Sequence, residues 1–252
     1  MEGPSLALAR EQLKPFTGKR VLEVTGNTTI AKERFDGQVV RELFSWGKHL
    51  VFQFDAFALK VHFLMVGTFE ADVDGASVTG DYRMARTPRL AFRFANGSIR
   101  MYNCSVKILE GPRIKRSYDF SVDVLARSWA PKQALDTLRS QDNEEVADVL
   151  LDQAIFSGVG NIIKNEVLSL ARIHPQAKVK DLGTAKRKEL IKLSRSFSQQ
   201  FLRWRRVFQL KKNLKVHQKS TCPYCSKKLL HPKTGKGIRR SHYCASCQKL
   251  KG

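Results

Sequence analysis

The sequence predicts an α+β protein built from three successive parts. Residues 20 to about 110 contain short alternating apolar runs separated by turn signals, a pattern typical of a β-sandwich or barrel. From about residue 125 the apolar residues recur every three or four positions, which indicates helices. Near the C-terminus, two Cys-x-x-Cys pairs form a cluster typical of a metal-binding finger. We therefore expect domains at residues 1–125, 126–215 and 216–252.

The first domain is expected to begin with a short helix and to continue as a two-layer β-sandwich. Leu6, Ala9 and Leu13 recur at helical spacing, and a proline two residues later ends the helix. The dipeptide Asn96-Gly97 is the strongest hairpin signal, because both residues tolerate the positive φ of a tight turn. The expected strands cover residues 21–24, 39–44, 50–54, 59–63, 90–94 and 98–102.

The second domain is expected to be a helical module. A Gly-Val-Gly segment at 158–160 interrupts the helical pattern, and a Lys-rich linker at 211–220 leads to the cysteines. The last helix is long and basic, with Leu190 and Phe197 on its apolar stripe. The expected helices cover residues 131–138, 144–153, 161–171 and 184–209.

The positive charge is concentrated in the C-terminal part. The formal net charge is +22, and residues 183–252 contain 20 Lys and Arg but a single acidic residue, Glu189. Such an excess predicts a polyanionic partner. A solvated tail for RNA or anionic lipid would carry the same charge, but the aromatic residues and cysteines favour an ordered nucleic-acid-binding structure.

No stretch of the sequence predicts a membrane segment or a signal peptide. Apolar runs stay far below the ~20 residues of a spanning helix. The N-terminus lacks a basic region followed by an apolar stretch. We therefore expect a cytoplasmic monomer without a membrane partner.

Four of the five cysteines are the expected ligands of one structural zinc ion: Cys222, Cys225, Cys244 and Cys247. Two Cys-x-x-Cys pairs at this spacing bring four thiolates to a tetrahedral centre and leave no open position for catalysis. An iron–sulfur cluster is the alternative. His231 and His242 lie between the pairs, and we expect both to stay outside the complete metal shell.

Three features together resemble one known family over essentially the whole chain. They are the start Met1-Glu2-Gly3-Pro4, the segment Gly158-Val159-Gly160-Asn161 and the C-terminal four-cysteine finger. In this order they are similar to the formamidopyrimidine-DNA glycosylase and endonuclease VIII family. The resemblance implies a helix-two-turn-helix module in the second domain. It also implies a base-excision repair enzyme that removes damaged, typically oxidised, bases from double-stranded DNA and cleaves abasic sites, acting at the bacterial nucleoid.

The resemblance implies three catalytic residues: Met1, Glu2 and Lys48. In the family, the N-terminal amine attacks C1′ of the damaged nucleotide and forms a Schiff base, while the neighbouring glutamate transfers protons. An α-amine has an ordinary pKa of about 7.7–8.0, so a useful fraction is neutral and nucleophilic near neutral pH. Lys48 follows Gly47 in a turn and resembles the family's lysine that contacts a phosphate beside the lesion.

Met1 departs from the family pattern, in which the mature nucleophile is proline. Glu2 should block removal of the initiator methionine, because the processing enzyme accepts only small second residues. Three interpretations stay open: a proline codon missing from the gene model, a Schiff base on the primary amine of Met1, or loss of the lyase chemistry. The last interpretation gives the alternative function, a non-catalytic protein that binds damaged or abasic DNA.

The resemblance also implies four DNA-binding residues: His62, Met65, Asn161 and Arg239. Met65 and its apolar neighbours match residues that fill the space left by an extruded base, although a buried strand end would show the same pattern. Asn161 starts a helix whose free N–H groups suit a phosphate, although a simple N-cap is the plainer interpretation. Arg239 precedes Cys244 by the spacing of the family's finger arginine, and a guanidinium can bind phosphate bidentately.

The segment around Cys104 departs from the formamidopyrimidine-type members. These carry Asp-Pro-Arg-Arg-Phe near this position, whereas this chain has Asn103-Cys104-Ser105. We therefore expect a protein closer to the endonuclease VIII-like members, with Cys104 buried in a strand.

Overall fold

A computed structural model describes residues 1–79 and 86–250 of the chain. The chain forms two compact units, the first made of Met1 and Ser5–Tyr118 and the second of Glu2–Pro4 and Asp119–Gly252. The finger groups with the helices in the second unit, so a separate domain starting at residue 216 stays a prediction. No helix in the described ranges is long and apolar enough to cross a membrane.

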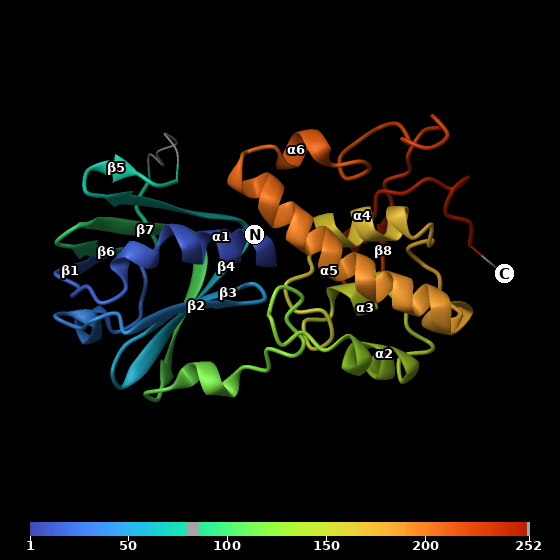
Figure 1. The fold of residues 1–252 in the computed structure, drawn as a ribbon. Coiled ribbons are helices and arrows are strands. Elements are labelled where there is room, and N and C mark those ends of the chain that lie inside the picture. Colours follow the sequence, from blue (N-terminus) through green and yellow to red (C-terminus); the bar gives the residue numbers. More distant parts are fainter. Residues whose placement is uncertain (80–85, 251–252) are drawn as a thin grey trace. The chain divides into compact units, whose positions relative to one another are not determined.

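The first unit contains one antiparallel sheet of seven strands in the order β1-β6-β7-β4-β3-β2, with β5 paired to β4 (Figure 1). Its bounds are β1 Glu23–Thr25, β2 Glu42–Trp46, β3 His49–Gln53, β4 Phe57–Val73, β5 Ala76–Ser77, β6 Leu90–Phe94 and β7 Gly97–Glu110. The expected hairpin at Asn96-Gly97 joins β6 to β7, and Gly97 has a φ of 141°.

This sheet folds over onto its own core. Three strand spacings separate β3 from β6, about 14 Å in a flat sheet. The rings of Phe52 on β3 and Phe92 on β6 nevertheless lie 6.0 Å apart. The bend is possible because β4 and β7 are long and their register shifts between Phe63 and Thr68. The sequence pattern predicted that the first of these strands ends at residue 63, because alternation of apolar residues does not reveal a strand that continues through a bend.

Helix α1 (Gly3–Gln12) covers this core as the apolar spacing predicted. Leu6, Ala9 and Leu13 are completely buried against the sheet. Phe35, in the 3-10 helix η2 (Lys32–Phe35), packs edge-on against Phe54 and Phe57. Two further 3-10 helices are η1 Lys14–Phe16 and η3 Ile114–Ser117.

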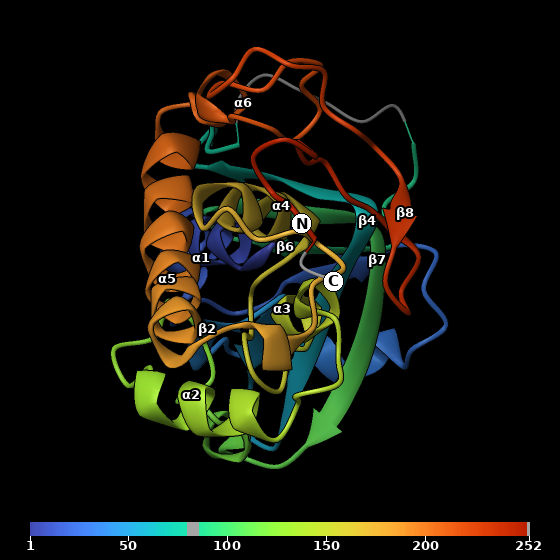
Figure 2. The ribbon, with the colours of Figure 1, turned by 90° about the vertical axis from the view of Figure 1, so that its right-hand side faces the viewer.

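The second unit is helical. Its elements are α2 Pro131–Arg139, α3 Val146–Leu151, α4 Asn161–Leu170, η4 Val179–Asp181, α5 Thr184–Arg206 and α6 Leu210–Asn213. Figure 2 shows the long α5 beside α4, with α2 lying across one end of α5; the three helices share one apolar core. Helix α5 ends three residues earlier than expected, since Phe208 adopts a φ of 56°. The short α6 lies where the sequence predicted only a linker.

The finger contains a small hairpin of β8 (Lys233–Thr234) and β9 (Arg239–Arg240). Its turn passes through Gly235, which has a φ of 73°, a conformation that glycine adopts without strain. Two-residue strands cannot hold such a hairpin without further support. The cysteines and the contacts with α4 described below supply that support.

Candidate functional site

The N-terminal segment of the second unit places a carboxylate on the start of α4. Glu2 is buried, and its Oε1 accepts a hydrogen bond from the backbone N–H of Ile162 at 2.7 Å. Its Oε2 accepts a second one from Ile163 at 3.2 Å. A helix start carries unsatisfied N–H groups and a partial positive charge, so it stabilises a carboxylate there. Glu2 is therefore held as a fixed, hydrogen-bonded acid.

Two glycines make this arrangement possible. The N–H of Gly3 donates to the carbonyl of Gly158 at 2.9 Å, which brings the two backbones together. A Cβ on Gly3 would lie 2.6 Å from the Gly158 Cα, and a Cβ on Gly160 would lie 2.4 Å from the Glu2 Cδ. The sequence showed these glycines only as a motif, and the structure gives them a steric reason.

In the first unit, the N-terminal amine lies in a group of cations. The Met1 nitrogen donates to the carbonyl of Leu64 at 3.4 Å. The pKa of His62 is lowered, first by burial and then by the nearby N-terminal amine, Lys48 and Lys60. This group can attract an anion such as a phosphate. Lys60 was not predicted, because a lone lysine in a strand has no motif around it.

His49 packs against this group. Its ring stacks on Trp46 at 5.7 Å and contacts the His62 ring edge-on at 5.6 Å. Burial and the neighbouring cations lower the pKa of His49 to about 4, so its imidazole is neutral at pH 7. Lys48 lies in the turn between β2 and β3, where Gly47 takes a φ of 50°.

The wedge segment, Leu64, Met65 and Val66, is exposed. Met65 and Val66 are 79% and 70% accessible to solvent, which excludes the interpretation as a buried strand end. The segment lies at the register shift of β4. Gly67 follows the segment, and only glycine fits there because a Cβ would lie 2.5 Å from the carbonyl oxygen of Asn103. Adjacent exposed apolar residues of this kind indicate a contact surface.

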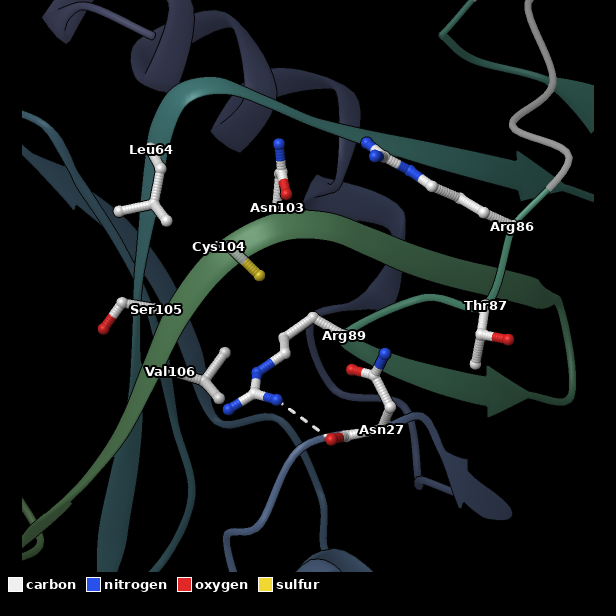
Figure 3. A pocket seen from close by; sticks show the side chains of 9 residues that line it. All are labelled: Asn27, Leu64, Arg86, Thr87, Arg89, Asn103, Cys104, Ser105 and Val106. Carbon is white, nitrogen blue, oxygen red and sulfur yellow. Dashed lines mark hydrogen bonds between the residues drawn. The ribbon is translucent and has the colours of Figure 1, made fainter.

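A pocket of about 540 Å³ lies beside the wedge segment. Figure 3 shows Leu64 at one edge and the side chains of Arg86 and Arg89 around it, with Arg89 donating to the Asn27 carbonyl at 2.9 Å. The described residues that line the pocket include no acidic side chain, so it suits an anionic or hydrogen-bonding group. The two arginines were missed because they lie outside any recognisable motif. Cys104 is buried here as expected, and burial raises the pKa of its thiol to about 11.

Asn161 and the finger are joined directly. The Asn161 side-chain amide donates to the carbonyl of Arg240 at 2.9 Å, and its Oδ1 is buried without a hydrogen-bond partner among the described residues. Arg239 is exposed on β9. Within the second unit, the structure brings Glu2, Asn161 and the arginine strand to the same end of α4. A phosphate contact by Asn161 or Arg239 stays a prediction.

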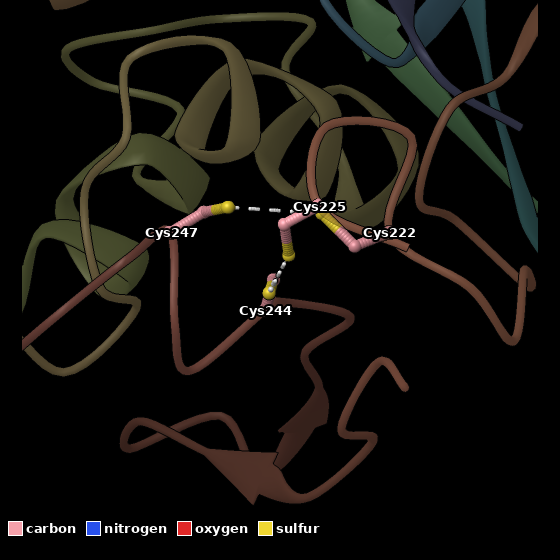
Figure 4. A group of neighbouring side chains, drawn as sticks. All are labelled: Cys222, Cys225, Cys244 and Cys247. Carbon is pink, nitrogen blue, oxygen red and sulfur yellow. Dashed lines mark hydrogen bonds between the residues drawn. The ribbon is translucent and has the colours of Figure 1, made fainter. Parts of the chain in front are cut away.

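The four predicted ligands converge in the finger (Figure 4). Their Sγ atoms all lie within 4.8 Å of one another, with Cys222 and Cys247 3.9 Å apart and Cys225 and Cys244 3.5 Å apart. A tetrahedron with Zn–S bonds of about 2.3 Å places its sulfur atoms about 3.8 Å apart, so the cluster fits one zinc ion. The structure therefore shows a site that could hold one metal ion.

Comparison with known proteins agrees with this geometry. Residues 120–200 match the family described as the formamidopyrimidine-DNA glycosylase H2TH domain. Endonuclease 8-like 3 from Mus musculus is 31% identical over 219 residues, covering 85% of this chain and 35% of the relative. The formamidopyrimidine-DNA glycosylase of Halalkalibacterium halodurans is 26% identical over 239 residues, covering 84% and 82%. The chain thus spans about a third of the length of the mammalian relative.

A solved structure shares the fold. It is the Lactococcus lactis formamidopyrimidine-DNA glycosylase bound non-covalently to DNA with an AP site, with a TM-score of 0.84, 20% identity and coverage of 99% of this chain and 100% of that one. The folded antiparallel sheet, the H2TH helices and the four-cysteine cluster define a mixed α and β protein of the H2TH class. The chain resembles the formamidopyrimidine-DNA glycosylase and endonuclease VIII family, and within it the endonuclease 8-like members.

Proposed function

We propose that the chain is a bifunctional base-excision repair enzyme, a DNA glycosylase with AP lyase activity. The observation that carries the proposal is the buried Glu2 carboxylate, fixed by two backbone N–H groups directly beside the amine of residue 1. A nucleophilic amine next to a positioned proton-transfer group is what Schiff-base chemistry requires.

In the proposed reaction the amine of Met1 attacks C1′ of the damaged nucleotide. The new C1′–N bond forms as the bond to the base breaks, and the base leaves with the proton that the attacking amine gives up. Glu2, which takes up a proton from solvent, then delivers it to the ring oxygen, and the bond between C1′ and this oxygen breaks to give a Schiff base. Removal of a proton from C2′ expels the 3′ phosphate and cuts the strand. If a proline precedes Glu2 in the mature protein, its secondary amine takes the same role.

We propose that cationic and neutral polar side chains, together with the wedge segment, hold the DNA. Lys48 and His62 lie near the amine in the first unit, and Asn161 and Arg239 lie at the start of α4 in the second. Phosphate contacts of this type position DNA without reading its sequence. Met65 would fill the stack when the damaged nucleotide is extruded, because it is exposed and apolar.

We propose zinc as the metal of the four-cysteine cluster, with a structural role. Four thiolates complete the tetrahedral shell, so the metal would hold the finger and take no part in the reaction. For the finer architecture we propose a two-layer sandwich, a helix-two-turn-helix module and a zinc-finger hairpin. The protein would act as a monomer on double-stranded DNA in a bacterial cytoplasm.

Borohydride trapping tests the proposal. The protein is incubated with duplex DNA carrying an abasic site in the presence of borohydride, which reduces a Schiff base to a stable bond. We expect a covalent adduct, and peptide mass spectrometry should place it on the residue that precedes Glu2. Binding without any adduct would show the non-catalytic alternative. An adduct on an internal lysine would contradict the assignment of the nucleophile.

A further inference from the structure

Three consecutive polar residues of α4, Lys164, Asn165 and Glu166, are almost completely buried. Their accessible fractions are 0%, 1% and 1%. Buried polar groups cost free energy unless they are paired, so their partners indicate what they do. In the described part of the chain, every side-chain hydrogen bond of these three residues ends in residues 215–217 or 240–242. We call them the α4 clamp.

Glu166 and Asn165 hold the chain on both sides of the finger hairpin. The Glu166 carboxylate accepts hydrogen bonds from the N–H groups of Lys215, Val216 and His217 at 2.8–2.9 Å. The Asn165 Oδ1 accepts one from the N–H of His242 at 3.3 Å, on the far side of the hairpin. The finger is therefore attached to α4 before and after its cation-bearing strand.

Lys164 differs from its two neighbours because it is a cation. Its Nζ donates to the Ser241 Oγ at 2.8 Å, and no carboxylate of the described residues lies within ion-pair distance of it. Ser241 directly follows Arg239 and Arg240, and its hydroxyl also contacts the Thr234 hydroxyl at 2.6 Å. The second contact is internal to the hairpin, whereas the Lys164 contact joins the hairpin to the helix.

Stability alone does not explain a lysine at this place. A buried charge without a carboxylate partner costs free energy, and an apolar residue of similar shape is often neutral or stabilising there. Lys164 lies one helical turn from the start of α4, where Glu2 is bound, and Asp148 and Arg239 are its other charged neighbours. Its charge-assisted hydrogen bond fixes the strand that bears the exposed arginine.

We propose that Lys164 is a positioning residue: through Ser241 it holds β9 so that Arg239 keeps a fixed place relative to the start of α4 and the Glu2 carboxylate. This inference rests on the proposed DNA binding. Lys164 itself touches no DNA, because it is fully buried. It acts by restricting the conformations of Arg239 in the free protein, so that less conformational entropy is lost when Arg239 binds a phosphate.

A double-mutant cycle in the full-length, metal-loaded protein tests this role. Dissociation constants are measured by fluorescence anisotropy on a duplex with an uncleavable tetrahydrofuran abasic-site analogue. We expect Lys164→Met to raise Kd about ten-fold, the size of one charge-assisted hydrogen bond. In an Arg239→Gln background the same change should alter Kd less than two-fold, because the residue being positioned is gone. Lys192→Met, an exposed lysine on α5, is the matched control and should change Kd less than two-fold.

Two further measurements separate this inference from the proposed function. Amide hydrogen exchange of residues 239–242 should accelerate in Lys164→Met without DNA, while residues 222–225 stay protected. Ser241→Ala removes the same hydrogen bond from the other side and should give the same exchange pattern. Effects of Lys164→Met and Arg239→Gln that simply add, or unchanged exchange, would overturn the positioning role. A wild-type protein that does not bind the duplex would overturn the proposed function, and the exchange result would still decide on Lys164.

Discussion

The Glu2 carboxylate lies 2.7 Å from the backbone nitrogen of Ile162, 160 residues further along the chain. Two observations show that the fold fixes the position of this side chain. Both carboxylate oxygens accept helix N–H groups, and the absence of a Cβ at Gly160 leaves space for the side chain. The acid therefore has one orientation, and a general acid–base group gains its effect from such fixed geometry.

Changing Glu2 to Gln should separate binding from chemistry. We expect strand cleavage to fall by about 10²–10⁴-fold, the usual contribution of a proton-transfer group. Affinity for abasic-site duplex should stay within about two-fold of wild type, since Glu2 is buried and carries no positive charge. Gel-based cleavage and anisotropy on the same duplex measure the two effects. Equal losses in both would assign Glu2 a purely structural role.

Gly160→Ala should disturb the same acid through sterics alone. The added Cβ would lie 2.4–2.5 Å from the Glu2 side chain, closer than any ordinary contact, so Glu2 must move away from Ile162. We expect a large loss of cleavage together with a lower free energy of unfolding, by about 1–3 kcal/mol for the displaced, buried carboxylate. The control is Gly183→Ala, where a Cβ meets no atom within 4 Å. Comparable losses in both variants would count against the steric argument.

The order of the elements could be predicted from the sequence, because it depends on local spacing. Leu6, Ala9 and Leu13 lie on the sheet as their helical spacing indicates, and the four cysteines meet as the Cys-x-x-Cys pairs require. Long-range geometry could not be predicted in this way. The bend of β4 depends on pairing with β7, where Phe63 pairs with Cys104 and Thr68 with Tyr102, each more than thirty positions further along the chain.

In the candidate site, too, local motifs could be predicted from the sequence, whereas long-range contacts could not. Glu2 and Asn161 belong to recognisable motifs, but the contact of Glu2 with α4 is visible only in the fold. Lys164 could not be singled out, because a lysine in a helix is normally exposed and the adjacent residues in the sequence do not predict its complete burial. Arg86 and Arg89 acquire a role only because folding places them beside the wedge segment.

Met65→Ala should affect DNA processing without affecting the fold. The side chain is 79% exposed, so the free energy of unfolding should change by less than about 0.5 kcal/mol. We expect slower excision from duplex DNA and little change on single-stranded DNA, where no stack has to be filled. Leu22→Ala, at another exposed apolar residue, should change neither rate. Equal slowing on both substrates would remove the wedge role.

Removal of the metal should loosen the finger. Cys225→Ser takes away one of four thiolates, and the two-residue strands of the hairpin cannot compensate. We expect loss of bound zinc by elemental analysis and a DNA affinity at least ten-fold weaker, because the finger arginines lose their support. Cys104→Ser is the control: this cysteine belongs to the first unit and is not one of the four cluster residues, so its variant should retain one zinc per chain. Full metal content in Cys225→Ser would show that the cluster binds metal differently.

The titration of Lys164 predicts a pH dependence of stability with a definite sign. Burial lowers the pKa of Lys164 from 10.5 to about 8, while Asp148 and Glu2 oppose the shift and Arg239 adds to it. Below pH 8 both the folded and the unfolded protein carry the proton, so the cost of the buried charge is fully present. Between pH 8 and 10.5 the folded state releases the proton and the unfolded state keeps it, so the free energy of unfolding rises.

The rise should amount to at most about 3 kcal/mol, and Lys164→Met should lack it. Burial lowers the pKa values of His217 and His242 to about 4, with Lys164 as a further cause, so both stay neutral throughout this range and do not contribute. Urea unfolding of both proteins at pH 7 and pH 9.5 measures the effect, and subtracting the variant from the wild type cancels every other titrating group. DNA affinity should move in the opposite direction, because a neutral amine makes a weaker hydrogen bond to Ser241. Parallel stability curves for the two proteins would show that Lys164 titrates normally and that its ammonium is not the group that holds β9.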